Sequence, residues 1–246
     1  MDLDIAPYAL VGSTLVCMLV GTVFFGAVLV FAILAWRRAT EKVGAAVRAA
    51  GYRAAAVPTE DALRETIPYA PAHATLDKLR IRRAWVRPDG REVIEVRRYS
   101  NSSDDDDPGF ELVIQERVPL PIADEVAIQL GPFQIPELLR AVAKDDSVNG
   151  VDPASGYRGV AASDSRLAAP LVMATLDGLP RPVPAALVSA LLDLAPSLND
   201  ANTRFRSAGW SLCFRLQTLI PDVSAARKAL ASADLVSAAA REWREA

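Results

Sequence analysis

The chain has 246 residues, of which 51% are hydrophobic, and a formal net charge of −3. This length suits one large domain or two small ones, and the weakly negative charge argues against a protein that mainly binds nucleic acid. The two cysteines, Cys17 and Cys213, are unlikely partners, so we expect no disulfide framework and a reducing compartment. Arginine outnumbers lysine and alanine is abundant, which is typical of a GC-rich bacterial genome.

The hydrophobic excess is concentrated near the N-terminus, where residues 5–36 carry no charged side chain. A helix over residues 8–36 is about 43 Å long and has large apolar residues on all sides, against a hydrocarbon core of ~30 Å. Thirteen Leu, Ile, Val or Phe residues between Leu15 and Ala35 favour insertion by roughly 4 to 8 kcal/mol. We therefore predict a transmembrane helix at residues 8–36 after a tail of residues 1–7.

A cleaved signal peptide is the alternative interpretation of this segment. Its leading region should be basic, but Asp2 and Asp4 make it acidic. The apolar run is also too long for a signal peptide, and no small-x-small cleavage site precedes Arg37. These features favour an anchor that stays attached.

The charges on the two sides of the apolar run predict its orientation. Basic residues follow the run directly and acidic residues precede it, and an excess of Lys and Arg marks the cytoplasmic side. We expect the N-terminus outside the cell membrane and the C-terminal domain in the cytoplasm. The expected membrane-interface residues are Tyr8, Trp36, Arg37, Arg38 and Lys42.

Self-association of the helix is a weaker possibility. Ser13, Cys17 and Gly21 recur every four residues and would form a ridge of small residues that allows close helix packing. Because small residues are common in such helices, chance accounts for this pattern at least as well. Whether the chain forms a homo-oligomer is therefore not decided by the sequence.

The residues after the anchor predict a juxtamembrane helical stalk at residues 37–57 and an α+β domain at residues 58–246. Residues 78–98 contain two runs rich in β-branched and aromatic residues around the turn Pro88-Asp89-Gly90, which is typical of a hairpin. A third strand follows near residues 109–118, with Phe110, Leu112 and Ile114 on its apolar face.

Later segments complete the expected antiparallel sheet and its helices. Residues 209–217 alternate apolar and polar side chains and are predicted to pair with residues 203–206. Apolar periodicity predicts several helices, including a long C-terminal one. Their ranges are residues 136–146, 169–176, 184–194 and 222–243.

Three polar features could carry function, and each has a simpler interpretation. His73 is the only histidine, so it cannot form a zinc site by itself. The run Asp104 to Asp107 lacks the alternation of a calcium loop, and we interpret it as a solvated connection. The hairpin carries eight basic against three acidic residues, which fits either a solvated strand face or contact with anions or lipid headgroups. The candidate contact residues are Arg80, Arg82, Arg83 and Arg87.

No phosphate-binding loop, dinucleotide fingerprint, nucleophile elbow, C-x-x-C pair or H-E-x-x-H helix occurs in the chain. We therefore predict no catalytic, cofactor-binding or metal-binding residue. The leading hypothesis is a membrane-anchored cytoplasmic interaction module that binds a protein partner or the lipid bilayer. The alternative is a membrane-anchored enzyme whose site is built from scattered Asp, Glu, Arg and Ser residues.

Overall fold

The protein is described from a computed structural model. Its described residues are 6–59, 62, 78–99, 109–122, 125–130, 158–160, 166, 171–194, 200–217 and 221–243. Within them, three helices and one antiparallel sheet account for the regular structure, so the predicted α+β class is confirmed.

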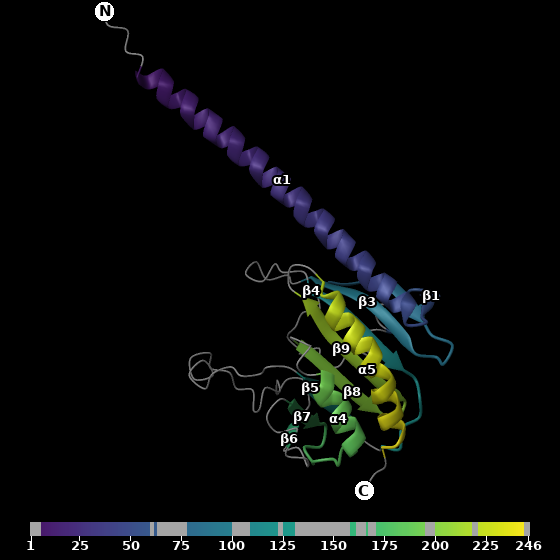
Figure 1. Cartoon of the computed structure of the whole chain (residues 1–246). Helices are drawn as coiled ribbons and strands as arrows, with labels where there is room; N and C mark the ends of the chain where they lie inside the picture. Colours follow the sequence, from purple (N-terminus) through teal and green to yellow (C-terminus); the bar gives the residue numbers. More distant parts are fainter. Residues whose placement is uncertain are drawn as a thin grey trace, which may run out of the picture.

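Helix α1 (Ala6–Ala49) is unbroken over 44 residues, and its N-terminal part projects away from the sheet (Figure 1). Residues 18–34, termed the apolar segment, are almost all exposed, with Phe25 at 75% and Phe31 at 73%. By length and composition, this helix can cross a membrane. Apolar side chains so exposed indicate an apolar surrounding or a partner.

Nine strands in the described residues form a single sheet in the order β1-β2-β3-β4-β9-β8-β5-β7-β6. Every neighbouring pair is antiparallel. The strands are β1 (Arg53–Ala55), β2 (Lys78–Val86), β3 (Glu92–Tyr99), β4 (Gly109–Glu116), β5 (Val126–Leu130), β6 (Arg158–Val160), β7 (Leu171–Thr175), β8 (Asp200–Arg206) and β9 (Gly209–Gln217).

Both predicted hairpins are confirmed. β2 pairs with β3 across the turn that contains Gly90, whose φ of 88° is a left-handed conformation that glycine adopts without strain. β8 pairs with β9 across Ser207 and Ala208, and Gly209 follows with φ of 143°. A Cβ at Gly209 would lie 2.2 Å from the carbonyl oxygen of Glu116, so this position admits only glycine.

Helices α4 (Ala185–Leu194) and α5 (Val223–Arg241) match two predicted helices. α5 begins at Asp222, whose carboxylate accepts hydrogen bonds from the backbone N–H groups of Ser224 and Ala225. Its buried stripe joins the same core as the buried residues of α4 and the inner side chains of β4 and β9. The two helices and the end of α1 therefore cover one face of the sheet (Figure 1).

The helix expected at residues 169–176 is wrong, because residues 171–175 form strand β7. A five-residue apolar run cannot be assigned to helix or strand by periodicity alone. Pairing decides here, since Val126 of β5 lies opposite Thr175 and Ile128 lies opposite Met173. The helix expected at residues 136–146 lies outside the described residues.

The last part of α1 is integrated into the domain. Residues 35–50, termed the docked segment, include Val43 and Val47, both fully buried in the main core together with Tyr52. The core of the sheet domain thus extends well before residue 58, where we placed the domain boundary. Val43 and Val47 are four residues apart, so they lie on one face of α1, and this face packs on the sheet.

Strand β4 is buried on both of its faces, although we expected an apolar face and a polar one. Phe110, Leu112 and Ile114 belong to the core under the helices, as predicted. On the opposite face, Val113 joins a second small core with Cys213, and Glu111 is within hydrogen-bond distance of the Cys213 thiol, at 3.6 Å. Both faces of this central strand are therefore needed for packing.

Candidate functional site

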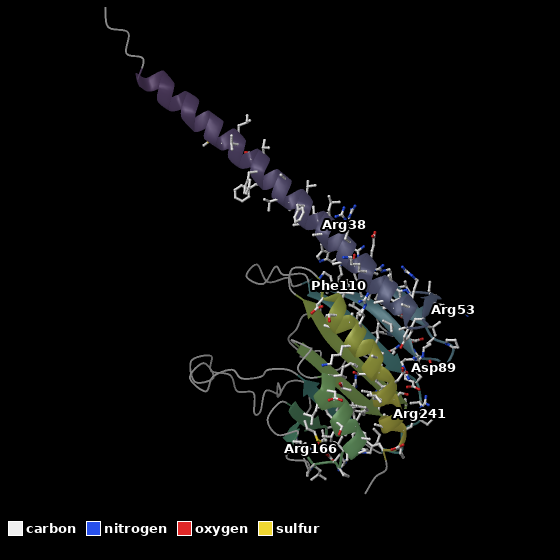
Figure 2. All side chains as sticks on the ribbon, viewed as in Figure 1. Arg38, Arg53, Asp89, Phe110, Arg166 and Arg241 are labelled. Atoms are coloured by element: carbon white, nitrogen blue, oxygen red, sulfur yellow. The ribbon has the colours of Figure 1, made fainter. Side chains whose placement is uncertain are left out.

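The docked segment meets the sheet first at Trp36, just after the apolar segment ends. Its ring lies edge-on to Phe110, with 6.0 Å between the ring centroids, and the guanidinium carbon of Arg97 lies 3.8 Å from the Trp36 ring centroid. Contacts of these two kinds contribute about 0.5 to 1.5 kcal/mol each. They place the end of β3 and the start of β4 beside the apolar segment, and Figure 2 shows Phe110 at the same end of the molecule as Arg38.

One turn further along α1, the helix is fastened to the β2–β3 hairpin by the half-buried Arg83, which pairs with the buried Glu95. Arg83 Nε donates to Glu95 Oε2 at 2.6 Å, and Arg83 Nη2 donates to the carbonyl oxygen of Thr40 at 2.9 Å. Burial raises the pKa of Glu95, and the positive charge of Arg83 opposes this rise. Gly44 leaves the room for the guanidinium, since a Cβ there would lie 2.8 Å from Arg83 Nη1.

A polar network that is buried at Arg91 and Glu116 lies at the opposite end of the docked segment. Arg91, almost fully buried, donates from Nη1 to Asp234 Oδ1 at 2.5 Å and lies 3.7 Å from both Asp89 and Glu116. Arg87 pairs with the same Asp234 oxygen at 2.6 Å and also with Asp89. The network thereby joins the hairpin turn to α5.

Glu116, at the end of β4, is the buried centre of this network. Trp210 Nε1 donates to its Oε2 at 3.0 Å, and the Ser237 hydroxyl and the Arg241 guanidinium also donate to its carboxylate. Because a buried polar group is stable only when it is hydrogen-bonded, these three donors allow the Glu116 side chain to be buried there. The network contains three carboxylates and three guanidinium groups, so its charges balance.

The ion pairs set the protonation of the network. Hydrogen bonds from Arg87 lower the pKa of Asp89 to about 2, and they also lower the pKa of Asp234. Burial raises the pKa of the Tyr52 phenol, which lies beside Arg87 at the end of α1. These carboxylates are ionised at neutral pH and engaged by arginine, an arrangement suited to fastening helix α5.

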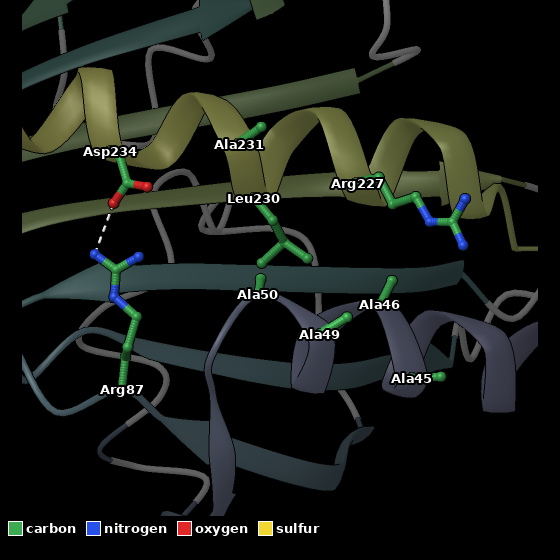
Figure 3. Close-up of a pocket in the computed structure, with 9 residues that line it drawn as sticks. All are labelled: Ala45, Ala46, Ala49, Ala50, Arg87, Arg227, Leu230, Ala231 and Asp234. Atoms are coloured by element: carbon green, nitrogen blue, oxygen red, sulfur yellow. Dashed lines mark hydrogen bonds and ion pairs between the residues drawn. The ribbon is translucent and has the colours of Figure 1, made fainter.

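A groove of about 530 Å³ lies between α1 and α5 (Figure 3). Its walls are mostly alanine, with Leu230 on the α5 side. Arg227 lies at one end, and the Arg87–Asp234 ion pair lies at the other. The groove is lined by Ala45, Ala46, Ala49, Ala50, Arg87, Arg227, Leu230, Ala231 and Asp234.

The predicted interface residues lie in two different surroundings. Trp36 is half-buried against Phe110, whereas Arg37, Arg38 and Lys42 are exposed on α1. The side chain of Tyr8 lies outside the described residues.

The four predicted headgroup contacts do not form one patch. Arg80 lies opposite Arg97 in the sheet, at the Trp36 end, and Arg82 is exposed beside it at a β-bulge. Arg83 is engaged by Glu95, and Arg87 lies at the far end of the docked segment. Arg87 is about 20 Å along the α1 axis from Trp36, by the helical rise per residue.

His73 and the run Asp104 to Asp107 lie outside the described residues. In the part of the chain that the structure describes, no three His, Cys, Asp or Glu residues are arranged to hold a metal ion. The acidic side chains of the buried network are instead engaged by arginines.

Comparison with protein-family models, curated proteins and solved structures finds no match to this chain. The interpretation of the groove and the network consequently depends on the chain's own geometry.

Sequence reasoning missed both the network and the groove. One signal was present: Glu116 continues the alternation of Phe110, Leu112 and Ile114, so it had to face the core. Its partners Arg91, Trp210 and Arg241 are distant in sequence, and only the fold brings them together. The groove requires knowing that α1 and α5 are neighbours, which no local pattern reveals.

Proposed function

We propose that the protein is a membrane-anchored interaction module. In this proposal the apolar segment spans the cell membrane, the N-terminus is outside and the sheet domain lies in the cytoplasm. The exposed Phe and Leu side chains of the apolar segment support the span. The basic residues that follow it, Arg37, Arg38 and Lys42, support the orientation.

The observation that carries this proposal is the continuity of α1. No break separates the exposed apolar segment from the docked segment, whose Val43 and Val47 are in the core of the domain. A flexible linker would let the domain tumble beneath the membrane, whereas a continuous helix fixes its orientation. A domain held in this way presents the same surface at a constant distance from the membrane. This favours binding to other membrane-associated molecules.

The same continuity determines which basic residues approach lipid headgroups. Arg37, Arg38 and Arg80 lie at the level of Trp36, where an interfacial tryptophan is stable. Arg87 lies about 20 Å further along α1, beyond a Debye length of about 8 Å at physiological salt. We propose headgroup contact for Arg80 and the α1 arginines, and a structural role for Arg83 and Arg87.

Fractionation and a topology reporter test the anchor. The full-length protein should stay in the membrane pellet after alkaline extraction, and a C-terminal reporter that is active only in the cytoplasm should give signal. Full recovery in the high-speed supernatant after lysis without detergent would refute the anchor, and a signal only outside the cytoplasm would refute the orientation.

Co-purification from native membranes tests the interaction role. The full-length protein should reproducibly bring down the same partner protein, or bind vesicles that contain anionic lipid. A protein that emerges alone and ignores such vesicles would show that it is not an interaction module.

A further inference from the structure

The groove between α1 and α5 is directed along α1 toward the apolar segment. Figure 3 shows α1 and α5 side by side and running in the same direction, with Ala45 and Arg227 toward one end of the groove and Ala50 and Asp234 toward the other. Because residue 45 is nearer the apolar segment than residue 50, the Arg227 end of the groove faces that segment. An elongated ligand in the groove would therefore lie alongside α1.

The walls of the groove suit an α-helix. Ala45 and Ala49 on one side and Ala231 on the other have side chains of a single carbon, which lets a third helix approach closely. Leu230 supplies an apolar floor. From Arg227 to Asp234 the groove is about 10 Å long, close to two helical turns.

The exposed charges beside the groove are mainly basic, and Glu41, four residues before Ala45, is the one exposed carboxylate on this part of α1. Arg38 and Lys42 share the ridge of α1 that carries Ala45 and Ala49, since the four are spaced by four, three and four residues. Both are exposed, as is Arg227 across the groove. The structure shows no ion-pair partner for these three cations among the residues it describes, whereas Asp234 at the far end is engaged by Arg87 and Arg91.

We infer that the groove binds the juxtamembrane helix of a different membrane protein, with small apolar residues on its contact face and carboxylates at its membrane-facing end. The apolar face packs on the alanines, and the carboxylates pair with Arg227, Lys42 and Arg38. The membrane origin of this helix rests on the anchor proposed above. The acidic, small-faced character of the helix rests on the groove alone.

A second copy of the chain is a poorer occupant because of charge. Its own juxtamembrane segment, residues 37–50, carries four basic residues and one acidic residue. Placing that segment beside Arg38, Lys42 and Arg227 would bring like charges together, which is unfavourable at an interface. Charge complementarity therefore selects an acidic helix from another protein.

Peptide binding to the full-length protein in lipid nanodiscs tests the chemistry. The probe is a fluorescent helical peptide of alanine and leucine on one face with three glutamates near one end, and the control peptide carries glutamines instead. We expect the acidic peptide to bind and Arg227→Glu to weaken it by about tenfold or more, since reversal removes an ion pair and adds repulsion. Lys228→Glu, an equal charge change next to the groove, should alter the affinity less than about twofold.

Three outcomes would overturn the inference: the two peptides bind equally, the two variants have equal effects, or the acidic peptide does not bind at about 1 mM. A dissociation constant of about 1 mM corresponds to a binding free energy of only about 4 kcal/mol. Arg227 and Lys228 are both exposed, so both variants should keep the thermal unfolding midpoint of the native protein. A variant with a lower midpoint is replaced by the corresponding glutamine.

Photocrosslinking in native membranes then identifies the occupant. A benzophenone amino acid at Ala231, in the groove, should crosslink to an acidic helix adjoining a membrane span of another protein. The same amino acid at Ala186, exposed on α4 outside the groove, should not give this product. Crosslinking to a second copy, to lipid alone or to a basic segment would overturn the inference. A protein found in the supernatant would instead refute the anchor and leave the peptide result standing.

Discussion

The two halves of α1 form one continuous helix in two different surroundings. The apolar segment exposes Phe25 and Phe31, whereas the docked segment buries Val43 and Val47 and exposes charged side chains. Both halves are α-helical, so the side chains alone distinguish the half with an exposed apolar surface from the half that packs in the domain. A change in one half should therefore leave the other half intact, and each prediction below tests this independence or the contacts that produce it.

The largest effect is expected from Glu116→Ala, which removes the centre of the network supporting α5 beside the docked segment. It leaves the buried Arg91 short of one carboxylate and Trp210 Nε1 without its acceptor. Breaking a buried pair costs about 3 to 5 kcal/mol. Urea unfolding of the full chain in detergent micelles, followed by tryptophan fluorescence, should show this loss.

The control for that experiment is Arg241→Ala, which removes a half-exposed partner of the same carboxylate. We expect it to cost only about 1 kcal/mol or less. If both variants lost the same free energy, or Glu116→Ala lost none, the network would not be the support that its geometry indicates. Membrane association should be normal in both variants because neither change touches the apolar segment.

Leu29→Arg makes the opposite test, since it alters the apolar segment only. Replacing leucine by arginine at the centre of a transmembrane helix costs about 3 to 4 kcal/mol on the insertion scale. The fraction of protein that resists alkaline extraction should fall markedly, while Leu29→Phe should leave it unchanged. Leu29 is exposed and contacts no core residue, so urea unfolding of the domain should be unaffected. Unchanged extraction of the arginine variant would contradict the membrane span.

The sequence is informative where a single physical rule determines the outcome. The uncharged run of apolar residues predicts the long helix that forms the first part of α1. The turn at Gly90 predicts the first hairpin. The alternation ending in Gln217 predicts β9. In each case the pattern is local, and the structure follows it.

Prediction failed where distant segments decide the structure. Residues 169–176 carry an apolar pattern compatible with a helix, and pairing with β5 makes residues 171–175 the strand β7. Residues 37–57 are predicted as a stalk because the helix should continue out of the membrane as far as Gly51, and no local pattern reveals that Val43 and Val47 pack on the sheet. The candidate groove depends on the same tertiary contact between α1 and α5.

A matched pair of valine truncations compares the two halves of α1 directly. Val47→Ala removes two methyl groups from a fully buried position and should cost about 2 kcal/mol. Val30→Ala, in the exposed apolar segment, should leave unfolding of the domain unchanged. Amide hydrogen exchange over residues 39–50 should accelerate in the first variant only. Equal exchange in both would indicate that the docked segment is stable without the core.

The smallest effect is expected from a change of pH, which alters the stability of the fold through the ion pairs beyond the end of the docked segment. The folded pKa of Asp89 is about 2, below its ordinary value of 3.8, because Arg87 donates to the carboxylate. A carboxylate with a lowered folded pKa stabilises the fold above its ordinary pKa, and this stability is lost as pH falls from about 4 toward 2. Asp89 is about one-third exposed, and screening reduces the effect to about 1 kcal/mol or less.

Asp89→Asn provides the comparison, because asparagine cannot titrate. The variant should be less stable than the native protein at pH 6 and approach it near pH 2, so the difference between the two urea midpoints should shrink across that interval. Asp234, whose pKa is also lowered, titrates in both proteins, but it shares Arg87 with Asp89, so the difference reports the two carboxylates as a coupled pair. A constant difference between pH 6 and pH 2 would show that the Arg87–Asp89 pair contributes nothing that depends on charge, and that Asp234 alone holds Arg87 beside α5.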